Sequence, residues 1–225
     1  MPEDSIPTLL ESLLRPPKRK YDYTWEPKIL LDYLEELGPN TNLSLKVLSR
    51  KTAALLALTT AHRLQTLALI SVENIMENEI QILITDKIKT TAVRREQPCL
   101  HIPFFKEKPN LCVASVLMHY VERSSKLRNE NQEFLFLTTK KPHKTASTDT
   151  LTRWIEEALT HAGINTKVFS AYSTRHAATS AAYRKGVLLD AIKKTSGWSE
   201  KSQVFARFYN QRLKNTLQLA KAVFK

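Results

Sequence analysis

Residues 167–212 of this 225-residue chain bring together three side chains that could act on a phosphodiester. Ser170 is placed to cap a helix whose early turns hold Arg175, and a helix N-terminus beside a forked guanidinium favours a phosphate group. Trp198 follows a Ser-Gly turn, and an indole N–H can donate a hydrogen bond to a phosphate oxygen. Tyr209 ends the stretch, and a phenol can act as a nucleophile. The stretch therefore predicts a site that handles phosphate.

Short helices are the elements that must position these side chains. The helix capped by Ser170 is predicted to end at Gly186, and a second helix is predicted over 188–196. Ser199 is predicted to begin a third helix, and its apolar face would consist of Val204, Phe205 and Phe208. Tyr209 could also be an ordinary core aromatic that extends this face, as could Trp198, and the pattern alone leaves that alternative open.

The rest of the chain predicts helices around one small sheet. Apolar side chains recur at helical spacing over residues 25–37, 44–60, 110–127 and 149–162. Two segments alternate between apolar and polar residues and predict a pair of antiparallel strands, 79–86 and 99–104. Phe104 is expected on the same face as Leu100 and Ile102. The predicted fold is therefore mainly α with a small antiparallel β-sheet, of the α+β class.

The charge of the chain favours an anionic partner. The formal net charge is +12, and residues 167–225 hold twelve Lys or Arg side chains against Asp190 and Glu200, so +10 of the +12 lies there. Nucleic acid is the partner that such a basic segment most often binds. A generally basic protein without this partner is the alternative.

Several classes of site are not expected. Cys99 and Cys112 are the only cysteines and have no C-x-x-C spacing, which argues against a zinc site and a disulfide scaffold and favours an intracellular compartment. The four glycines form no phosphate cradle, so no nucleotide cofactor is expected. The acidic residues are scattered and not clustered as metal-dependent strand transfer requires, so we predict neither a metal nor any other cofactor. No signal peptide or membrane span is recognised.

A basic cluster, RPPKRK, occupies residues 15–20. It could be a nuclear address or simply a solvated basic turn. With a nucleic acid partner expected, we predict a nuclear location. Residues 1–24 as a whole mix proline, charge and a short apolar segment, which is typical of a weakly ordered arm.

Four segments, in order, resemble the motifs of the tyrosine recombinase (phage-integrase-like) family. They are AHRLQTLALI (61–70), DKIKTT (86–91), YSTRH (172–176) and GWSEKSQVFARFYN (197–210). The resemblance covers residues 44–215 and is closest to the recombinases of DIRS-type retroelements and Cryptons in animal genomes. It implies the catalytic-domain fold of DNA breaking-rejoining enzymes over residues 44–225. Residues 1–43 would be an N-terminal arm and the remnant of a helical core-binding domain.

The resemblance also implies a catalytic role for each motif residue. Tyr209 would attack the phosphorus and hold the strand as a 3′-phosphotyrosine. Arg63 and Arg175 would bind the non-bridging oxygens, and Trp198 would donate its indole N–H to one of them. The general acid would be Lys89, which precedes a threonine as in the family, with Lys87 as the alternative.

This sequence departs from the family pattern at two positions. Tyr172 stands where relatives carry the first histidine of His-x-x-Arg, and a phenol, which titrates near 10, cannot accept a proton near neutral pH. Thr66 stands where many relatives carry an acidic residue. His176 occurs in many relatives and is interpreted as a structural residue of the DNA-binding region, not as a relocated base. We therefore expect a slowed enzyme or a decayed copy.

Basic side chains in two connections are candidates for binding DNA. The connection 86–98 and the loop 140–145 could each reach toward the phosphate backbone or be solvated turns. The candidates are Lys87, Arg94, Arg95, Lys140, Lys141 and Lys144, together with His176.

The predicted function is that of a site-specific recombinase or integrase of mobile-element origin, acting on double-stranded DNA. Its protomers would assemble as a homo-oligomer on DNA, and residues 216–225 have apolar side chains that could pack on a neighbour or on the same chain. The alternative is a non-catalytic DNA-binding module derived from a recombinase. An RNA-binding helical protein is not favoured, because no aromatic platform motif is present.

Overall fold

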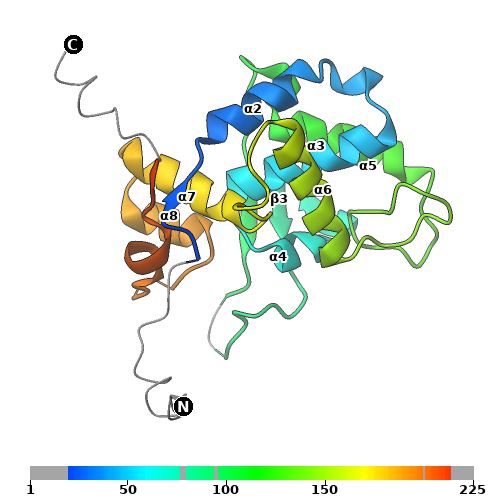
Figure 1. Cartoon of the computed structure of the whole chain (residues 1–225). Helices are drawn as coiled ribbons and strands as arrows, with labels where there is room; N and C mark the ends of the chain where they lie inside the picture. The colour runs from blue at the N-terminus through cyan, green and yellow to red at the C-terminus, as the bar shows by residue number, and fades with distance from the viewer. Residues whose placement is uncertain (1–19, 77–79, 94–95, 200, 214–225) are drawn as a thin grey trace, which may run out of the picture.

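The computed structural model describes residues 20–76, 80–93, 96–199 and 201–213 (Figure 1). The helices are α2 (Pro27–Glu36), α3 (Leu45–Thr60), α4 (Leu64–Ala68), α5 (Val113–Ser125), α6 (Thr148–His161), α7 (Ser173–Arg184) and α8 (Leu189–Thr195). The strands are β1 (Tyr23–Thr24), β2 (Ile75–Met76), β3 (Ile80–Leu83), β4 (Cys99–Ile102) and β5 (Arg212–Leu213). Short 3-10 turns occur at Asn40–Asn42, Val72–Asn74 and Pro109–Leu111, and a π-helical turn, η4, spans Phe205–Tyr209.

Helix α3 is the central element of the main core. Ser44 caps it, because its side-chain oxygen accepts a hydrogen bond from the amide of Val47. From Leu48 onward most of its residues are buried, and the helix packs against α5 and α6. Each fully buried leucine stabilises the fold by about 1.5–3 kcal/mol. No helix in the described part of the chain combines the length and apolar character needed to cross a membrane.

The small sheet lies beside this helical core. Strands β2, β3 and β4 are antiparallel in that order, with Ile82 opposite Leu100. The predicted pair of strands is confirmed, whereas the short third strand β2 was not predicted. Phe104 lies beyond the end of β4 and is 50% exposed, so the prediction that it shares the buried face is wrong.

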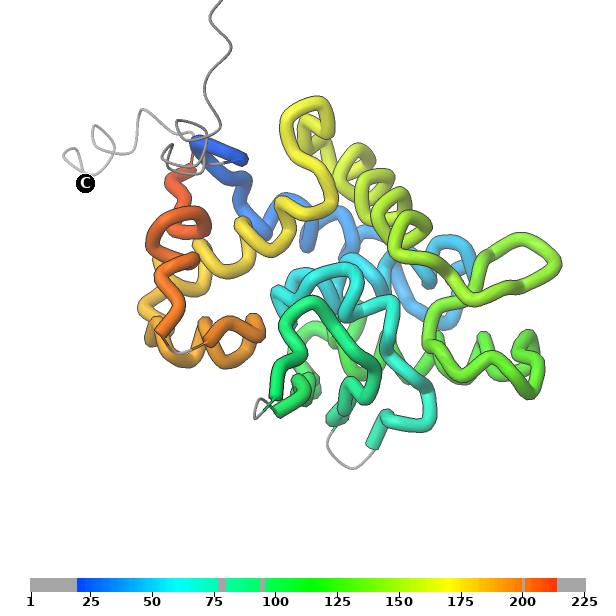
Figure 2. Tube along the Cα trace, turned by 90° about the horizontal axis from the view of Figure 1, so that it is seen from below, coloured from blue at the N-terminus to red at the C-terminus, as the bar shows by residue number. Residues whose placement is uncertain are grey.

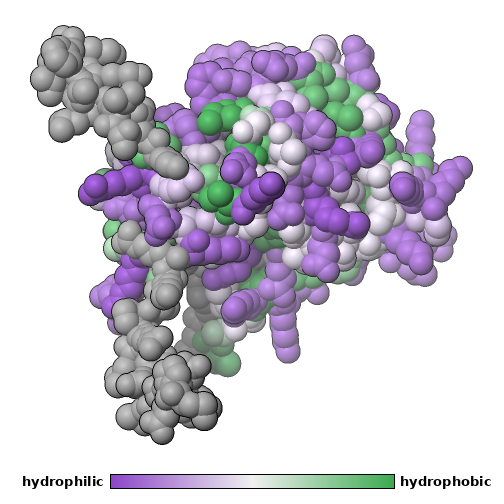
Figure 3. Space-filling view, in the orientation of Figure 1, coloured by the Kyte–Doolittle hydropathy of each residue, from purple (hydrophilic) through white to green (hydrophobic). Residues whose placement is uncertain are grey.

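A second, smaller hydrophobic cluster lies at the other end of the molecule, where α7, α8 and η4 meet. Its buried members are Ile192, Trp198, Phe205 and Tyr209. In Figure 2 this end, coloured yellow to red, forms a lobe beside the cyan and green elements that contain the sheet. The face seen in Figure 3 is mostly hydrophilic, so the apolar clusters are largely enclosed there.

The N-terminal end of the described chain packs on this second lobe. We call residues 20–26 the strap. Its strand β1 pairs in parallel with β5, with Tyr23 opposite Arg212, and Trp25 donates its indole N–H to the Ser173 hydroxyl at 2.9 Å. The expectation of a weakly ordered arm is therefore wrong for residues 20–24. The division of the chain at residue 43 stays a prediction.

Two local predictions near the second lobe are wrong. Ser170 does not cap α7, because its hydroxyl is engaged with Lys20 and Tyr21 of the strap. Ser199 does not begin a helix, since the next helical turn starts only at Val204, which is 37% exposed and not part of an apolar face. The second helix, α8, lies within the range predicted for it.

Candidate active site

Arg175 is a buried cation at the centre of the second lobe. It lies in the first turn of α7 and is 1% exposed. Its Nη2 donates to the carbonyl of Ser196 at 2.9 Å, but its Nε and Nη1 have no hydrogen-bond partner, and it forms no ion pair among the described residues. Burial lowers the pKa of Arg175 to about 10, so it is still charged at neutral pH. A buried charge without a counterion strongly favours the arrival of an anion.

Two aromatic rings flank the Arg175 guanidinium. Its Cζ lies 4.4 Å from the centroid of the Trp198 ring and 5.4 Å from that of Tyr209. Cation–π contacts of this kind stabilise a charge without using its N–H donors. The unpaired donors of Arg175 therefore remain available next to the Tyr209 side chain.

Arg63, which lies far from Arg175 in the sequence, is the second candidate phosphate-binding arginine. It is half-buried and lies directly before α4. Its charge lowers the pKa of Arg175 and that of Tyr209, so Arg63 acts electrostatically on both groups. The segment that leads to it begins at Ala61, whose φ of 49° is a left-handed conformation that costs a residue with a side chain about 1–2 kcal/mol. The sharp exit from α3 is thus part of how Arg63 is positioned.

Tyr209 is buried, and hydrogen bonds fix its backbone. It is 3% exposed and ends the π-helical turn η4. Its carbonyl accepts a hydrogen bond from the Ser180 hydroxyl, which in turn accepts from the amide of Gln211 at 3.0 Å. π-helical turns occur often at functional sites, because they redirect a side chain within a helical segment.

The Tyr209 hydroxyl is hydrogen-bonded to the hydroxyl of Tyr172. Burial raises the pKa of Tyr209, the bond with Tyr172 raises it further, and the charges of Arg175 and Arg63 oppose the increase. The phenol is therefore neutral in this state. Tyr172 is 37% exposed, so the cluster opens to the surface at its side chain.

Trp198 completes the wall beside Arg175. It is 8% exposed, lies 4.7 Å from Tyr209 between ring centroids, and its Nε1 has no hydrogen-bond partner in the described residues. The preceding Gly197 has φ +66°, and a Cβ there would lie 2.8 Å from Cε1 of His62. Gly197 thus permits both the turn and the close packing of His62 under Trp198.

His176 lies behind the candidate nucleophile. Its ring stacks on the Tyr209 ring at 4.0 Å with an interplanar angle of 13°, and it is 2% exposed. Burial lowers the pKa of His176 to about 4, with contributions from Arg175 and Lys20 that the neighbouring Phe208 backbone partly offsets. The imidazole is neutral, and its ring packs against that of Tyr209. A direct contact of His176 with DNA stays a prediction.

The predicted lysines do not join this cluster in the structure. Lys87 and Lys89 are both exposed on the connection that follows β3. The base of this connection is fastened by Gln97, which donates to the carbonyl of Asp86 at 2.7 Å. Neither lysine contacts Arg175 or Tyr209 within the described residues, so the choice between them as general acid stays open.

The other predicted basic residues lie elsewhere. Lys140, Lys141 and Lys144 are exposed on a loop at the end of the molecule opposite to α7 and α8 in both Figures 1 and 2. Arg94 and Arg95 lie outside the described residues. A contact of any of these side chains with DNA remains a prediction.

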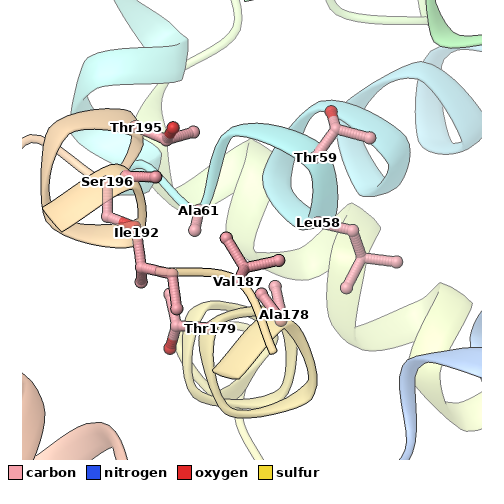
Figure 4. Close-up of a pocket in the computed structure, with 11 residues that line it drawn as sticks. Leu58, Thr59, Ala61, Ala178, Thr179, Val187, Ile192, Thr195 and Ser196 are labelled. Carbon is pink, nitrogen blue, oxygen red and sulfur yellow. The ribbon is translucent and has the colours of Figure 1, made fainter. Parts of the chain in front are cut away.

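An apolar cavity of about 180 Å³ lies next to the cluster, between the end of α3, α7 and α8 (Figure 4). Side chains such as Leu58, Val187 and Ile192 line it, and no charged residue does. A phosphate would not be stabilised there, so the cavity is not the phosphate site.

Several residues that build the site were not predicted from the sequence motifs. His62 supports the Trp198 turn, Ser180 holds the backbone of Tyr209, and the strap covers one side of the cluster. The aromatic run YDYTW over residues 21–25 was an available signal, because three large aromatics in five residues are unusual in a disordered arm.

The fold is similar to that of several solved recombinases. XerA recombinase matches with a TM-score of 0.64 and 17% identity over 94% of this chain and 67% of its own. XerH, solved as a post-cleavage complex with a palindromic difH substrate, matches with a TM-score of 0.62 and 18% identity over 90% of this chain and 53% of its own. A lambda integrase dimer bound to a COC′ core site matches with a TM-score of 0.54 and 15% identity over 88% of this chain and 51% of its own. The chain thus spans between half and two-thirds of the length of these proteins.

The mainly helical architecture with its small antiparallel sheet is the fold of a tyrosine recombinase catalytic domain. The model of the phage integrase family matches residues 29–215, and the chain belongs to that family. No curated protein sequence matches it.

Proposed function

We propose that this chain is the catalytic domain of a site-specific recombinase that cleaves and rejoins double-stranded DNA through a 3′-phosphotyrosine intermediate. The observation that carries the proposal is the buried Arg175, whose guanidinium has two unpaired nitrogens and lies beside the Tyr209 ring. A scissile phosphate would supply the missing counterion and the electrophile at once. Membership of the phage integrase family supports the same conclusion.

The chemistry follows from the groups that surround the phosphate. The Tyr209 oxygen forms a bond to phosphorus, the bond from phosphorus to the 5′-oxygen breaks, and the phenolic proton passes to a non-bridging phosphate oxygen or to solvent. Arg175, Arg63 and the free indole N–H of Trp198 stabilise the charge on the non-bridging oxygens. Lys89 protonates the departing 5′-oxygen once DNA draws its loop inward.

The particular element and location belong to the same proposal. We assign the chain to a mobile element of the DIRS or Crypton type, acting in the nucleus, on the basis of its four motifs and its basic C-terminal quarter. Its fold also resembles that of an integrase from the transposon Tn1549, with a TM-score of 0.57. Assembly as a homo-oligomer on DNA is supported by lambda integrase, solved as a tetramer on a Holliday junction.

A second candidate function is a DNA-binding module that has lost turnover. Tyr172 favours it, because this phenol occupies the place of the family histidine and holds the Tyr209 hydroxyl in a hydrogen bond. Both functions predict DNA binding, but only the first predicts a covalent product.

Trapping of the covalent intermediate separates the two functions. We expect the protein to form a denaturation-resistant adduct with members of a pool of nicked duplexes randomised around the nick, because release of the short 5′ fragment prevents religation. Tyr209→Phe should abolish the adduct and leave DNA binding within about twofold, since only one hydroxyl is lost. Binding by both proteins without an adduct from either would establish the module instead.

A further inference from the structure

The open edge of the candidate active site carries a cation that no motif includes. Lys20, the last residue of the basic cluster 15–20, begins the strap. Its Nζ lies 5.1 Å from the centroid of the Tyr172 ring, and Tyr172 is the exposed member of the cluster around Tyr209. The Lys20 charge is close enough to lower the pKa of the buried His176. The Lys20 ammonium thus lies beside the exposed member of the cluster.

The strap fixes this lysine by contacts on both sides. Lys20 donates to the Ser170 hydroxyl at 3.3 Å, and Tyr21 shares a hydrogen bond of 2.8 Å with the same hydroxyl. The Tyr21 ring is 5% exposed and meets the ring of His176 edge to face at 5.1 Å between centroids. Tyr21, His176 and Tyr209 therefore pack in series, which ties the position of Lys20 to that of the candidate nucleophile.

Farther along the strap, two more contacts hold it to the segment that carries Tyr209. Glu26 forms an ion pair with Arg184 at 3.0 Å, and Arg184 also donates to the carbonyl of Gln211 at 3.2 Å. The pairing of β1 with β5 adds backbone hydrogen bonds to the same segment. The strap is thus an integral wall of the site.

Lys20 has no carboxylate partner among the described residues. Its ammonium can turn away from Ser170 toward a phosphate without breaking an ion pair. Three donors on a flexible stem suit a phosphate oxygen whose position varies along the strand.

We propose that Lys20 is a phosphate-binding residue of the active site, which contacts the scissile phosphate or its immediate neighbour on the cleaved strand. This inference rests on the proposed function, because one of its tests measures the rate of adduct formation. The alternative is a purely structural role, in which the Lys20 side chain only anchors the strap through its hydrogen bond with Ser170.

The test compares Lys20→Gln, which keeps a hydrogen-bond donor but loses the charge, with Lys20→Arg, which keeps the charge. Adduct formation is measured on a nicked duplex selected from the randomised pool. We expect Lys20→Gln to slow the adduct by about tenfold, less than the about 10² to 10³ lost with a buried donor. Lys20→Arg should recover most of the rate. Lys46→Gln, a change at an exposed lysine in the first turn of α3, is the matched control and should leave the rate unchanged.

Single neutral methylphosphonates in the same duplex locate the contact. If Lys20 binds the scissile or the adjacent phosphate, the rate difference between wild type and Lys20→Gln should disappear when that one phosphate is neutral. An equal rate ratio at every methylphosphonate position would overturn the proposal, because a structural anchor does not sense the charge of one phosphate.

A binding measurement keeps this inference separate from the catalytic one. If the wild-type protein forms no adduct, the proposed function fails, but the salt dependence of duplex binding still reports on Lys20. Loss of one phosphate contact should reduce the slope of log K against log salt by about one in Lys20→Gln and not in Lys46→Gln. An unchanged slope would rule out the contact.

Discussion

The hydroxyls of Tyr172 and Tyr209 meet where the reaction would begin. The hydrogen bond with Tyr172 helps to raise the pKa of Tyr209, and a phenol in the place of the family histidine cannot accept its proton near pH 7. The proton of Tyr209 must then pass to the phosphate itself or to solvent, while the charges of Arg175 and Arg63 favour its release.

This arrangement predicts a gain of activity from a single substitution. Tyr172→His introduces a group whose ordinary pKa is near 6.5 and which can accept the phenolic proton, so adduct formation should become faster by about tenfold or more. Tyr172→Phe is the control, because it removes the same hydroxyl without adding a base. Single-turnover rates for the three proteins measure the effect, and equal rates for the His and Phe variants would contradict the interpretation.

The buried imidazole of His176 predicts a dependence of stability on pH. Its folded-state pKa of about 4 lies below the ordinary value of about 6.5. The unfolded chain therefore binds more protons between these values, and the free energy of unfolding falls as the pH drops from about 6.5 toward 4. The contribution is on the order of 2 kcal/mol.

Urea unfolding at pH 7 and pH 4.5 measures that contribution. His176→Phe keeps an aromatic ring against Tyr209 and should lose part of the stability decrease that the wild-type protein shows on acidification. His101→Asn changes an exposed histidine on β4 and should keep the whole decrease. A decrease of equal size in all three proteins would show that His176 does not carry it.

At the scale of the elements, the turn between α8 and Trp198 depends on two properties of Gly197. Its φ is positive, and its Cα hydrogen packs where a methyl group would collide with His62. Gly186, at the end of α7, has φ +84° but no atom within 4 Å of a Cβ built there. An alanine at position 186 would therefore meet only the cost of the backbone conformation, whereas an alanine at position 197 would also collide with His62.

Gly197→Ala should destabilise the protein by about 2–5 kcal/mol, the sum of backbone strain and overpacking. Gly186→Ala should cost only the strain, about 1–2 kcal/mol. His62→Ala in the Gly197→Ala background should remove the collision and recover the difference, which a double-mutant cycle by chemical denaturation would show. Absence of any coupling between the two positions would mean that His62 does not support this turn.

The sequence predicted the elements whose signals are local. Ser44 and the apolar spacing that follows it are enough to indicate α3, and the alternation that includes Ile80 and Ile82 is enough to indicate β3, although β3 ends before the predicted residue 86. The strap could not be predicted in the same way. Its order depends on contacts with Ser170, Ser173 and β5, which lie near the other end of the chain and compete with the local tendency of the arm to stay unstructured. Ser170 shows the same competition, because Tyr21 engages the hydroxyl that was expected to cap α7.

At the scale of the whole molecule, the motifs predicted a set of side chains for one site but not the burial or position of each. Arg175, Trp198 and Tyr209 come from separated segments and pack together, and the charge of Arg63 acts on Arg175 and Tyr209. The catalytic roles that the family resemblance implies for these four residues stay predictions. The full burial of Tyr209 and the exposure of Lys89 away from it could not be derived from spacing, since both depend on how the second lobe packs. A loop carrying Lys89 would have to move toward the cluster when DNA binds.

The central claim is that Tyr209, and not its neighbour, becomes bonded to the DNA strand. Protease digestion of the trapped adduct, followed by mass spectrometry of the peptide that carries the nucleotide, tests this claim directly. We predict a single modified peptide with the phosphodiester on Tyr209. A nucleotide on the more exposed Tyr172, or a protein that binds the nicked duplexes and yields no modified tyrosine, would contradict the account.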